Sequence, residues 1–337
     1  MSNQDRFASF PKVVKSNRLN ILPENPENPD DGQAVGPGRF PSWLHRKLPK
    51  GSDLWKTGSI IEGNRLHTVC EEANCPNLLE CWSKKTATFL AMGKECTRNC
   101  GFCDIDFTKA PKALEADEPE RIADSVKKLG LRHVVITMVA RDDLPDGGAG
   151  HIAKIIKEIR TQVEETTIEV LTSDFSGNLH SLDFVLQAEP EIFNHNIETV
   201  RTMTPRVRHT ATYDRTLMVL EHAKKHRTNS SMLVKSGIMV GLGETREQVE
   251  ETLQDLAKAS CDIVTIGQYL QPNRRKLLVK AFIHPDEFRH YEEFGKSIGI
   301  GYMYCGPFVR SSYNANLVIK QANDKIITIN SESYDGT

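Results

Sequence analysis

Three cysteines, Cys96, Cys100 and Cys103, lie within a stretch of eight residues. Their thiolates can converge on one face of an iron–sulfur cube, and Gly101 allows the tight backbone turn between them. Because such a cube has four irons, three protein ligands leave one iron open to a small molecule. The alternative is a structural zinc site or a disulfide cluster, although zinc sites usually take four ligands, often from paired Cys-x2-Cys units.

A second cysteine triplet precedes the first along the chain, at Cys70, Cys75 and Cys81. Its Cys-x4-Cys-x5-Cys spacing again offers three thiolates, so a fourth ligand would come from elsewhere in the chain. The two triplets hold six of the eight cysteines. This favours two clusters with different tasks over the alternative of a reduced, buried trio without metal. Cys261 and Cys305 stand alone and are expected to be small apolar side chains.

The composition is that of a globular protein with reduced cysteines. The chain has 337 residues, of which 39% are hydrophobic and 26% charged, and its net charge is −2. This balance does not indicate nucleic acid as a partner, and no run of about eighteen apolar residues predicts a membrane span. No signal-peptide core is present, so we expect a cytoplasmic location. A mitochondrial transit peptide is the alternative, suggested by Arg6, Lys12, Lys15 and Arg18.

After the first triplet, apolar β-branched runs alternate with amphipathic stretches, which indicates βαβ units and a parallel sheet. We expect strands over residues 86–92, 132–139, 167–172, 192–198, 233–241 and 261–269. We expect helices over residues 117–129, 148–162, 178–187, 213–227, 245–259 and 285–298. Six repeats predict an α/β fold of the incomplete (β/α)6 barrel type, a partial TIM barrel, with its chemistry at the C-terminal ends of the strands. A doubly wound open sheet is the competing topology.

Further motifs make the pattern more specific than either triplet alone. Near the C-terminus lies Arg310-Ser311-Ser312-Tyr313. The other motifs are Thr68–Asn77, Arg141–Leu144, Asp146–Gly148, Phe193–Thr199, Lys235–Glu244 and Thr265–Pro272. The Cys-x3-Cys-x2-Cys triplet resembles the signature of radical S-adenosylmethionine (SAM) enzymes. Together with the upstream triplet and the serine pair, the motifs closely resemble the lipoyl synthase family over roughly residues 40–316.

The resemblance implies a reaction. Enzymes of this family insert two sulfur atoms at C6 and C8 of an octanoyl chain that is held on a lysine of a carrier domain. One [4Fe–4S] cluster cleaves SAM to a 5′-deoxyadenosyl radical, and an auxiliary [4Fe–4S] cluster donates the sulfur. A carbon radical suits the task, because these carbons are unactivated and offer nothing to an acid, base or nucleophile. The cofactors carry the chemistry and the protein orients them.

The resemblance also implies the ligands of both clusters. The SAM-binding cluster would be held by Cys96, Cys100 and Cys103, and the auxiliary cluster by Cys70, Cys75, Cys81 and Ser312. A serine oxygen is a harder ligand than a thiolate, so it would be a replaceable ligand for a cluster that is taken apart. Without the other motifs, the serine pair would be interpreted as a solvated C-terminal turn.

Contacts to SAM are expected from the loops that follow the strands. Asn196 and Glu198 could hydrogen-bond the SAM ribose, and Arg208 could bind the SAM carboxylate. The alternatives are a satisfied strand-end network for the first two residues and a solvated loop charge for the arginine. His195 is expected to be a packed strand residue. The Gly241–Glu244 stretch lacks the third glycine of a dinucleotide site, so it is interpreted as a tight βα turn.

The resemblance divides the chain into four parts. They are a flexible N-terminal arm (1–40), an extension with the auxiliary cysteines (41–85), the barrel (86–300) and a C-terminal extension with the serine ligand and a polar tail (301–337). Four positions depart from the usual family pattern: Met138, Ala140, Thr172 and Ser173. None of the four is a predicted metal ligand, so any effect would fall on substrate affinity or on the preferred carrier protein.

The implied partners are octanoylated lipoyl carrier proteins, namely the E2 subunits of 2-oxoacid dehydrogenases and the H protein of glycine cleavage. An electron donor such as ferredoxin or flavodoxin and an iron–sulfur carrier protein are also implied, without nucleic acid or membrane. Arg274, Arg275, Lys276 and Lys280 form a basic loop at the end of the last repeat, which could steer an acidic carrier domain. A solvated run of loop charges is the alternative.

Two competing functions come from different classes. The first is another sulfur-inserting radical SAM enzyme, either a methylthiotransferase or a biotin synthase-like enzyme. The former carries additional domains, and the latter would not explain the upstream triplet or the serine pair. The second is a non-enzymatic iron–sulfur electron carrier, which the open ligand position and the barrel-sized chain argue against.

Overall fold

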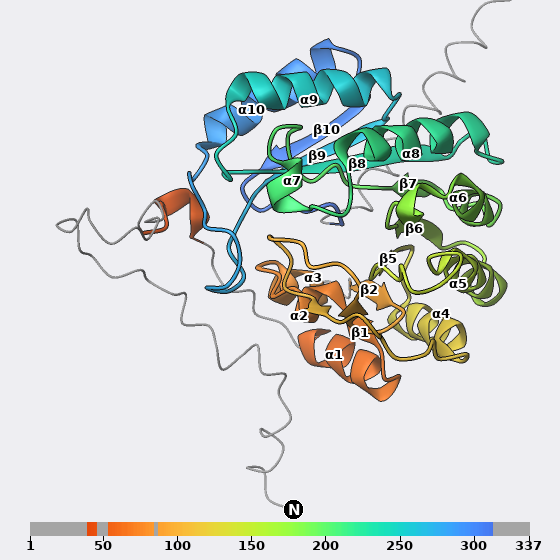
Figure 1. Cartoon of the computed structure of the whole chain (residues 1–337). Coiled ribbons are helices and arrows are strands. Elements are labelled where there is room, and N and C mark those ends of the chain that lie inside the picture. Colours follow the sequence, from red (N-terminus) through yellow and green to blue (C-terminus); the bar gives the residue numbers. More distant parts are fainter. Residues whose placement is uncertain (1–38, 46–52, 84–86, 313–337) are drawn as a thin grey trace, which may run out of the picture.

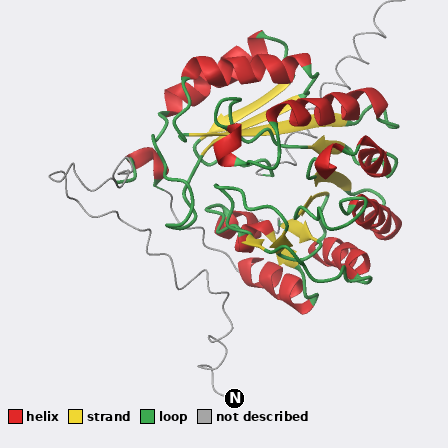
Figure 2. Ribbon diagram, viewed as in Figure 1, coloured by secondary structure: helices red, strands yellow, loops and turns green. Residues whose placement is uncertain are grey.

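The structure is a computed structural model in which residues 39–45, 53–83 and 87–312 are described. Within these residues one curved sheet of eight strands carries helices along its outer side (Figure 1). In spatial order the strands are β1 (His67–Thr68), β2 (Thr88–Ala91), β5 (His133–Met138), β6 (Thr167–Leu171), β7 (Ile192–Asn194), β8 (Leu233–Val240), β9 (Ile263–Gln268) and β10 (Tyr302–Gly306). Figure 2 shows the strands inside an arc of helices.

The strand order decides between the two topologies that the sequence pattern allows. From β2 to β10, each strand of the large sheet pairs in parallel with the next one along the chain. A doubly wound sheet would reverse its strand order at a switch point, and the order observed among the described strands has no such reversal. The incomplete (β/α)6 barrel is therefore confirmed, and the doubly wound alternative is wrong.

Helices form where apolar residues recur at helical spacing and where capping residues bound them. The barrel helices are α4 (Glu118–Leu129), α5 (Ala149–Gln162), α6 (Leu179–Leu186), α8 (Tyr213–His226), α9 (Arg246–Lys258) and α10 (Pro285–Ser297). Helix α9 buries Leu253 and Leu256, and it begins at a capping box between Thr245 and Gln248. Helix α4 ends at Gly130, whose φ of 64° is a left-handed conformation that glycine adopts without strain.

The predicted helices agree with the structure to within one residue at each end, whereas one strand is shorter than expected. Strand β7 ends at Asn194, although the apolar pattern predicts a strand as far as residue 198. Glu198 has a left-handed φ of 66°, which ends regular pairing. What remains of the predicted strand is an isolated bridge between Glu198 and Ile238.

Strand β10 was not expected from the sequence, which predicts a C-terminal extension from residue 301. Tyr302–Gly306 pairs in parallel with β9, so the barrel sheet continues into that segment. Most residues of this strand are only half-buried. The short apolar run Tyr302–Cys305 was the signal that the sequence offered for this strand.

The segment that carries the upstream triplet packs beside β2. It consists of α1 (Asp53–Gly63), β1, α2 (Val69–Glu72) and α3 (Leu78–Ser83). Strand β1 pairs antiparallel with β2, and α1 approaches α3 so closely that a Cβ at Gly58 would lie 2.9 Å from the Trp82 ring. Most of the predicted N-terminal arm and the tail beyond Ser312 lie outside the described residues. Within the described segments, none of the helices is long and apolar enough to cross a membrane.

Candidate active site

The first cysteine triplet lies on the loop that leaves β2 at its C-terminal end. Two short parallel strands, β3 (Glu95–Cys96) and β4 (Asp106–Phe107), close the base of this loop. At its tip, Gly101 N donates to Val207 O at 2.8 Å and Gly101 O accepts from Leu277 N at 2.9 Å. A Cβ at position 101 would lie 3.0 Å from the Leu277 side chain. Glycine therefore permits the close contact that holds the loop in place.

The thiols of this loop lie close enough to influence one another. Burial, with a further contribution from Cys96, raises the pKa of Cys100 to about 11. Burial raises the pKa of Cys103 to about 12, and the two neighbouring thiols add to the rise. Buried thiolates at this proximity repel one another unless cations lie among them, so the donor set fits an iron–sulfur cluster.

The second triplet lies on a compact turn between two short helices. Cys70 is in α2, Cys81 is in α3, and Cys75 lies between them, where its N–H donates to Cys70 O at 3.0 Å. Burial, followed by the charges of Cys75 and Cys81, raises the pKa of Cys70. The three cysteines therefore lie on one compact segment, where their thiols influence one another.

The structure also bears on the kind of metal group that these thiols could hold. Over the described part of the chain, no three His, Cys, Asp or Glu side chains are placed to hold one metal ion together. A four-iron cluster makes a different demand, because each cysteine bonds a separate iron and the sulfurs stand further apart. Three thiols on one short segment are the donor chemistry that such a cluster takes, and both triplets supply it.

A turn after β10 links the second triplet to the end of β7. Asn77, which is 1% exposed, donates from Nδ2 to Phe308 O at 2.8 Å. Further along this turn, Ser311 Oγ donates to Asn196 Oδ1 at 2.8 Å. Ser312 follows directly and is half-buried. These contacts support its predicted place near the auxiliary triplet, while its role as a ligand stays a prediction.

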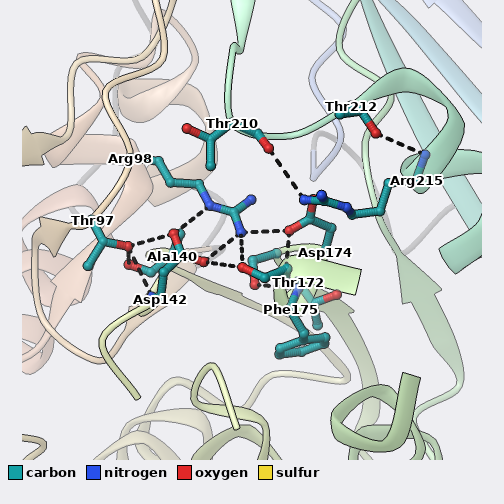
Figure 3. A network of polar contacts seen from close by, with 12 residues as sticks. Thr97, Arg98, Ala140, Asp142, Thr172, Asp174, Phe175, Thr210, Thr212 and Arg215 are labelled. Atoms are coloured by element: carbon teal, nitrogen blue, oxygen red, sulfur yellow. Dashed lines mark hydrogen bonds and ion pairs between the residues drawn. The ribbon is translucent and has the colours of Figure 1, made fainter. Parts of the chain in front are cut away.

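Arg98 anchors the first cysteine loop to the barrel, as Figure 3 shows. The Arg98 side chain is only 6% exposed. Its guanidinium donates to Asp142 from Nε at 2.8 Å and from Nη2 at 2.6 Å. It also pairs with Asp174 at 2.7 Å, and Arg215 of α8 contacts the same carboxylate at 3.1 Å. Burial opposes the charge of Asp142 and is the largest single influence, but the hydrogen bonds and charge of Arg98, with hydrogen bonds from Ser176 and Thr97, together lower the pKa of Asp142 to about 2. The network ties the loops after β2, β5 and β6 together.

The three residues predicted to contact SAM are brought together beyond the end of β7. Arg208, which follows α7 (Thr204–Val207), donates from Nη1 to Asn196 O at 2.9 Å and from Nη2 to the Thr216 hydroxyl. Its 4% exposure shows that the alternative of a solvated loop charge is wrong. Burial raises the pKa of Glu198, and the nearby Arg208 acts in the opposite direction.

Arg208 also retains an unused donor. Its buried Nε has no hydrogen-bond partner within the described residues. Buried polar groups are rarely left in this state, so an acceptor on a bound ligand would complete the arrangement. The carboxylate of SAM is such an acceptor, which keeps the predicted role of Arg208 open to test.

Comparison with known proteins agrees with this geometry. A profile of the radical SAM superfamily matches residues 90–256. The lipoyl synthase of Protochlamydia amoebophila is 69% identical over 318 residues, covering 94% of this chain and 98% of that protein. This chain belongs to the lipoyl synthase family. The lipoyl synthase of Chlamydia muridarum is 50% identical over 304 residues, covering 90% of this chain and 97% of that protein.

Membership in the lipoyl synthase family makes this chain a radical SAM enzyme that uses SAM and [4Fe–4S] clusters, as the sequence motifs predict. Among solved structures, methylornithine synthase overlaps 72% of this chain and 80% of its own chain, with a TM-score of 0.48 and 13% identity.

Two neighbouring stretches have the structural roles that the sequence predicts. Burial lowers the pKa of His195 to about 4. Its Nδ1 lies 2.9 Å from Thr172 O, so His195 is a packed, neutral side chain at the end of β7. The Gly241–Glu244 stretch forms a tight turn. In this turn the Glu244 carboxylate accepts hydrogen bonds from the N–H groups of Gly241 and Leu242.

Sequence reasoning missed several residues that shape the site. Lys235 Nζ donates to both carboxylate oxygens of Glu169, at 2.9 and 3.0 Å, and the two side chains are at most 1% exposed. The pair could have been predicted from the sequence, because Glu169 and Lys235 are charged residues within otherwise apolar strands. Arg98 and Asp174 were also missed, because nothing in the sequence indicates that residues so far apart form an ion pair.

The predicted basic loop divides into two kinds of residue. Arg274, Arg275 and Lys280 are exposed. Lys276 is half-buried, and its ammonium lies 3.4 Å from Cys100 O and 3.5 Å from Asn99 Oδ1. Lys276 therefore belongs to the support of the first cysteine loop, while the other three cations face solvent.

Proposed function

We propose that this protein inserts two sulfur atoms at C6 and C8 of an octanoyl group that is amide-linked to a lysine of a lipoyl carrier protein. One observation carries the proposal: two triplets of neighbouring thiols lie in a chain that is 69% identical to a lipoyl synthase over 94% of its length. When bound, SAM and the two clusters supply a carbon radical and the sulfur atoms. The side chains of this protein hold, orient and shield those groups.

The residues on the barrel side would bind the SAM-binding cluster and SAM. Cys96, Cys100 and Cys103 would hold the cluster, on a loop that Arg98 keeps in place. Arg208 would bind the SAM carboxylate through its unpaired Nε. Asn196 and Glu198 would bind the ribose hydroxyls, since both lie at the end of β7 beside this arginine. Each of these contacts is a proposal supported by the proximity of the three side chains.

The residues of the upstream turn would bind the auxiliary cluster. Cys70, Cys75 and Cys81 would supply three ligands and Ser312 the fourth. The hydrogen bond between Asn77 and Phe308 supports this assignment, because it draws the turn after β10 towards the upstream triplet. A serine oxygen would bind iron less firmly than a thiolate, which suits a cluster that gives up its sulfur.

The substrates would be octanoylated E2 subunits of 2-oxoacid dehydrogenases and the H protein of glycine cleavage. A ferredoxin or flavodoxin would supply electrons, and an iron–sulfur carrier protein would rebuild the auxiliary cluster. The reaction would take place in the cytoplasm. The exposed residues Arg274, Arg275 and Lys280 lie on the loop after β9 and would attract an acidic carrier domain.

The activity is tested by anaerobic incubation of the reduced, cluster-loaded protein with SAM and an octanoyl-lysyl peptide. We expect 5′-deoxyadenosine and a peptide whose mass shows two added sulfur atoms. Release of 5′-deoxyadenosine without sulfur in the peptide would indicate a different radical SAM reaction. Absence of both products would favour the electron-carrier alternative.

The docking surface is tested by changing Arg274, Arg275 and Lys280 together to Gln. We expect KM for an octanoylated H protein to rise about tenfold at low salt, and the difference to shrink as salt screens the charges. KM for the short octanoyl-lysyl peptide should stay unchanged. The control changes three exposed cations near the other end of the barrel: Lys127, Lys128 and Arg132. Equal effects of both sets, or of both substrates, would contradict docking at this loop.

A further inference from the structure

Asp104 joins three segments that are far apart in the sequence. It directly follows Cys103, the last cysteine of the first triplet. Its Oδ2 accepts a hydrogen bond from Asn74 Nδ2 at 2.5 Å, across 30 residues. Its Oδ1 accepts a second one from Asn273 Nδ2, across 169 residues. The carboxylate therefore contacts the turn of the second triplet on one side and the loop after β9 on the other.

Asn74 is the residue that makes the contact from the auxiliary side. It directly precedes Cys75 and has a left-handed φ of 48°. Asparagine and glycine both tolerate this conformation, but asparagine alone of the two carries an amide that reaches a carboxylate. Hydrogen bonds to a charged acceptor are about twice as strong as neutral ones, which suits a contact at an exposed position.

A second contact fixes the far side of the same turn. Asn77 Nδ2 donates to Phe308 O at 2.8 Å, so the turn is held by Asp104 near Cys75 and by the chain after β10 beyond it. The loop after β9 is fixed to the first triplet as well, through Leu277 N and Gly101 O at 2.9 Å. Asp104 thus lies where both cysteine loops and the loop after β9 meet.

We infer that Asp104 is a positioning residue, which sets the auxiliary cysteine turn relative to the SAM-binding cysteine loop through Asn74. The inference rests on the proposed function, in which a radical formed at one site is followed by sulfur transfer from the other. Each radical must meet its sulfur source before it is quenched, so the separation of the two loops has to be fixed. Asn273 adds the loop after β9 to the same arrangement.

The test exchanges the two partners of this hydrogen bond. Asn74→Asp places two carboxylates against each other, and Asp104→Ala removes the acceptor. The double variant Asn74→Asp with Asp104→Asn restores an amide–carboxylate pair with the roles exchanged. The new amide at position 104 can still accept from Asn273 through its oxygen. Aspartate tolerates the left-handed conformation at position 74, so the backbone is unchanged in these variants.

The first measurement is hydrogen exchange of the cluster-loaded protein at the amides of residues 73–75, which donate to the carbonyls of Val69, Glu71 and Cys70. Asn74→Asp should speed exchange there about tenfold, and the exchanged pair should return it to within about twofold of the parent. Asn178→Asp is the matched control. That asparagine accepts hydrogen bonds from two backbone N–H groups, a role that aspartate fills equally well.

The second measurement is the ratio of 5′-deoxyadenosine released to sulfur atoms inserted. Asn74→Asp and Asp104→Ala should raise this ratio about tenfold while SAM cleavage and iron content stay within twofold of the parent. The exchanged pair should restore the ratio. Unchanged exchange and an unchanged ratio in Asn74→Asp would overturn the positioning role, as would failure of the exchanged pair to rescue either measurement. A failed proposed function would differ, because the parent protein itself would then insert no sulfur.

Discussion

The two cysteine loops are held in different ways. The first loop leaves a barrel strand and is fixed by the buried guanidinium of Arg98, which pairs with carboxylates after β5 and β6. The second is a turn between two short helices at the side of the barrel, held at its ends by the amides of Asn74 and Asn77. One loop follows a parallel barrel strand, while the other lies between two short helices next to β1, the antiparallel strand beside β2.

This difference corresponds to the tasks that we propose for the two loops. A cluster that cleaves SAM twice per product has to stay in place, and buried ion pairs hold its loop in one arrangement. A cluster that gives up sulfur has to be rebuilt, and its turn is held by single side-chain hydrogen bonds, from Asn74 to the Asp104 carboxylate and from Asn77 to a backbone carbonyl, which cost less to open than a buried ion-pair network. If the supports are independent, each loop can be disabled without loss of the function of the other.

The largest effect is expected from loss of the first triplet. Replacing Cys96, Cys100 and Cys103 by Ala should abolish SAM cleavage and remove about half of the iron, since one of two clusters loses its ligands. Iron analysis and 5′-deoxyadenosine release measure the two outcomes. Cleavage of SAM by this variant would refute the assignment of the first loop.

Loss of a single auxiliary ligand should separate the two activities. Cys75→Ala should leave SAM cleavage within about twofold of the parent while no lipoyl product forms, because the barrel-side cluster keeps its ligands. Peptide mass and 5′-deoxyadenosine are measured in the same reaction. Lipoyl product at the level of the parent would show that this triplet is not the sulfur source.

The buried support of the first loop should be costly to remove. Arg98→Met leaves the carboxylate of Asp174, whose side chain is fully buried, without its closer cation. Removing one partner of a buried pair destabilises a protein by about 3–5 kcal/mol, and we expect a loss of this size in the free energy of unfolding. Denaturant unfolding measures it. Lys94→Met, which removes an exposed cation from the same loop, is the control and should change the value by less than about 0.5 kcal/mol.

Sequence reasoning succeeded where local pattern decides the structure. Apolar runs such as Val134-Val135-Ile136 are buried on both faces of a parallel sheet, so their strands were predicted closely. The cysteines were recognised by spacing, because ligands on one loop have to be near one another in sequence. Strand β10 was missed although Tyr302–Cys305 is a short apolar run, because a run of this length does not by itself distinguish a strand from other buried structure.

The polar contacts that position the site could not be predicted in the same way. Arg98 and Asp142 are 44 residues apart, and Asp104 and Asn273 are 169 apart. The fold brings these pairs together only after the strand order is known. Sequence spacing therefore predicts the ligands, while the structure was needed to find the residues that position them.

The smallest and most selective effects are expected at the serine pair. Ser311 Oγ donates to Asn196 Oδ1 at 2.8 Å, so its hydroxyl is directed towards the residues proposed to bind SAM. Ser311→Ala should therefore raise KM for SAM a few-fold and leave auxiliary iron unchanged. Ser312→Ala should have the opposite pattern, with SAM cleavage retained and sulfur insertion lost. The two adjacent serines would then report separately on the two loops.

A third variant examines why the auxiliary site would use an oxygen ligand. Ser312→Cys offers a thiolate, which suits iron–sulfur chemistry better than an alkoxide. We expect this variant to hold its iron at least as well as the parent, yet to insert sulfur slowly, because a firmer ligand resists the loss of iron that sulfur donation requires. Iron content measures whether the variant keeps its auxiliary cluster, and product mass followed over time measures how fast it inserts sulfur. If Ser312→Ala and Ser312→Cys both insert sulfur at the parent rate, the fourth ligand lies elsewhere. The proposal that the Ser312 ligand is released during turnover is supported only if Ser312→Cys keeps its iron and inserts sulfur more slowly than the parent.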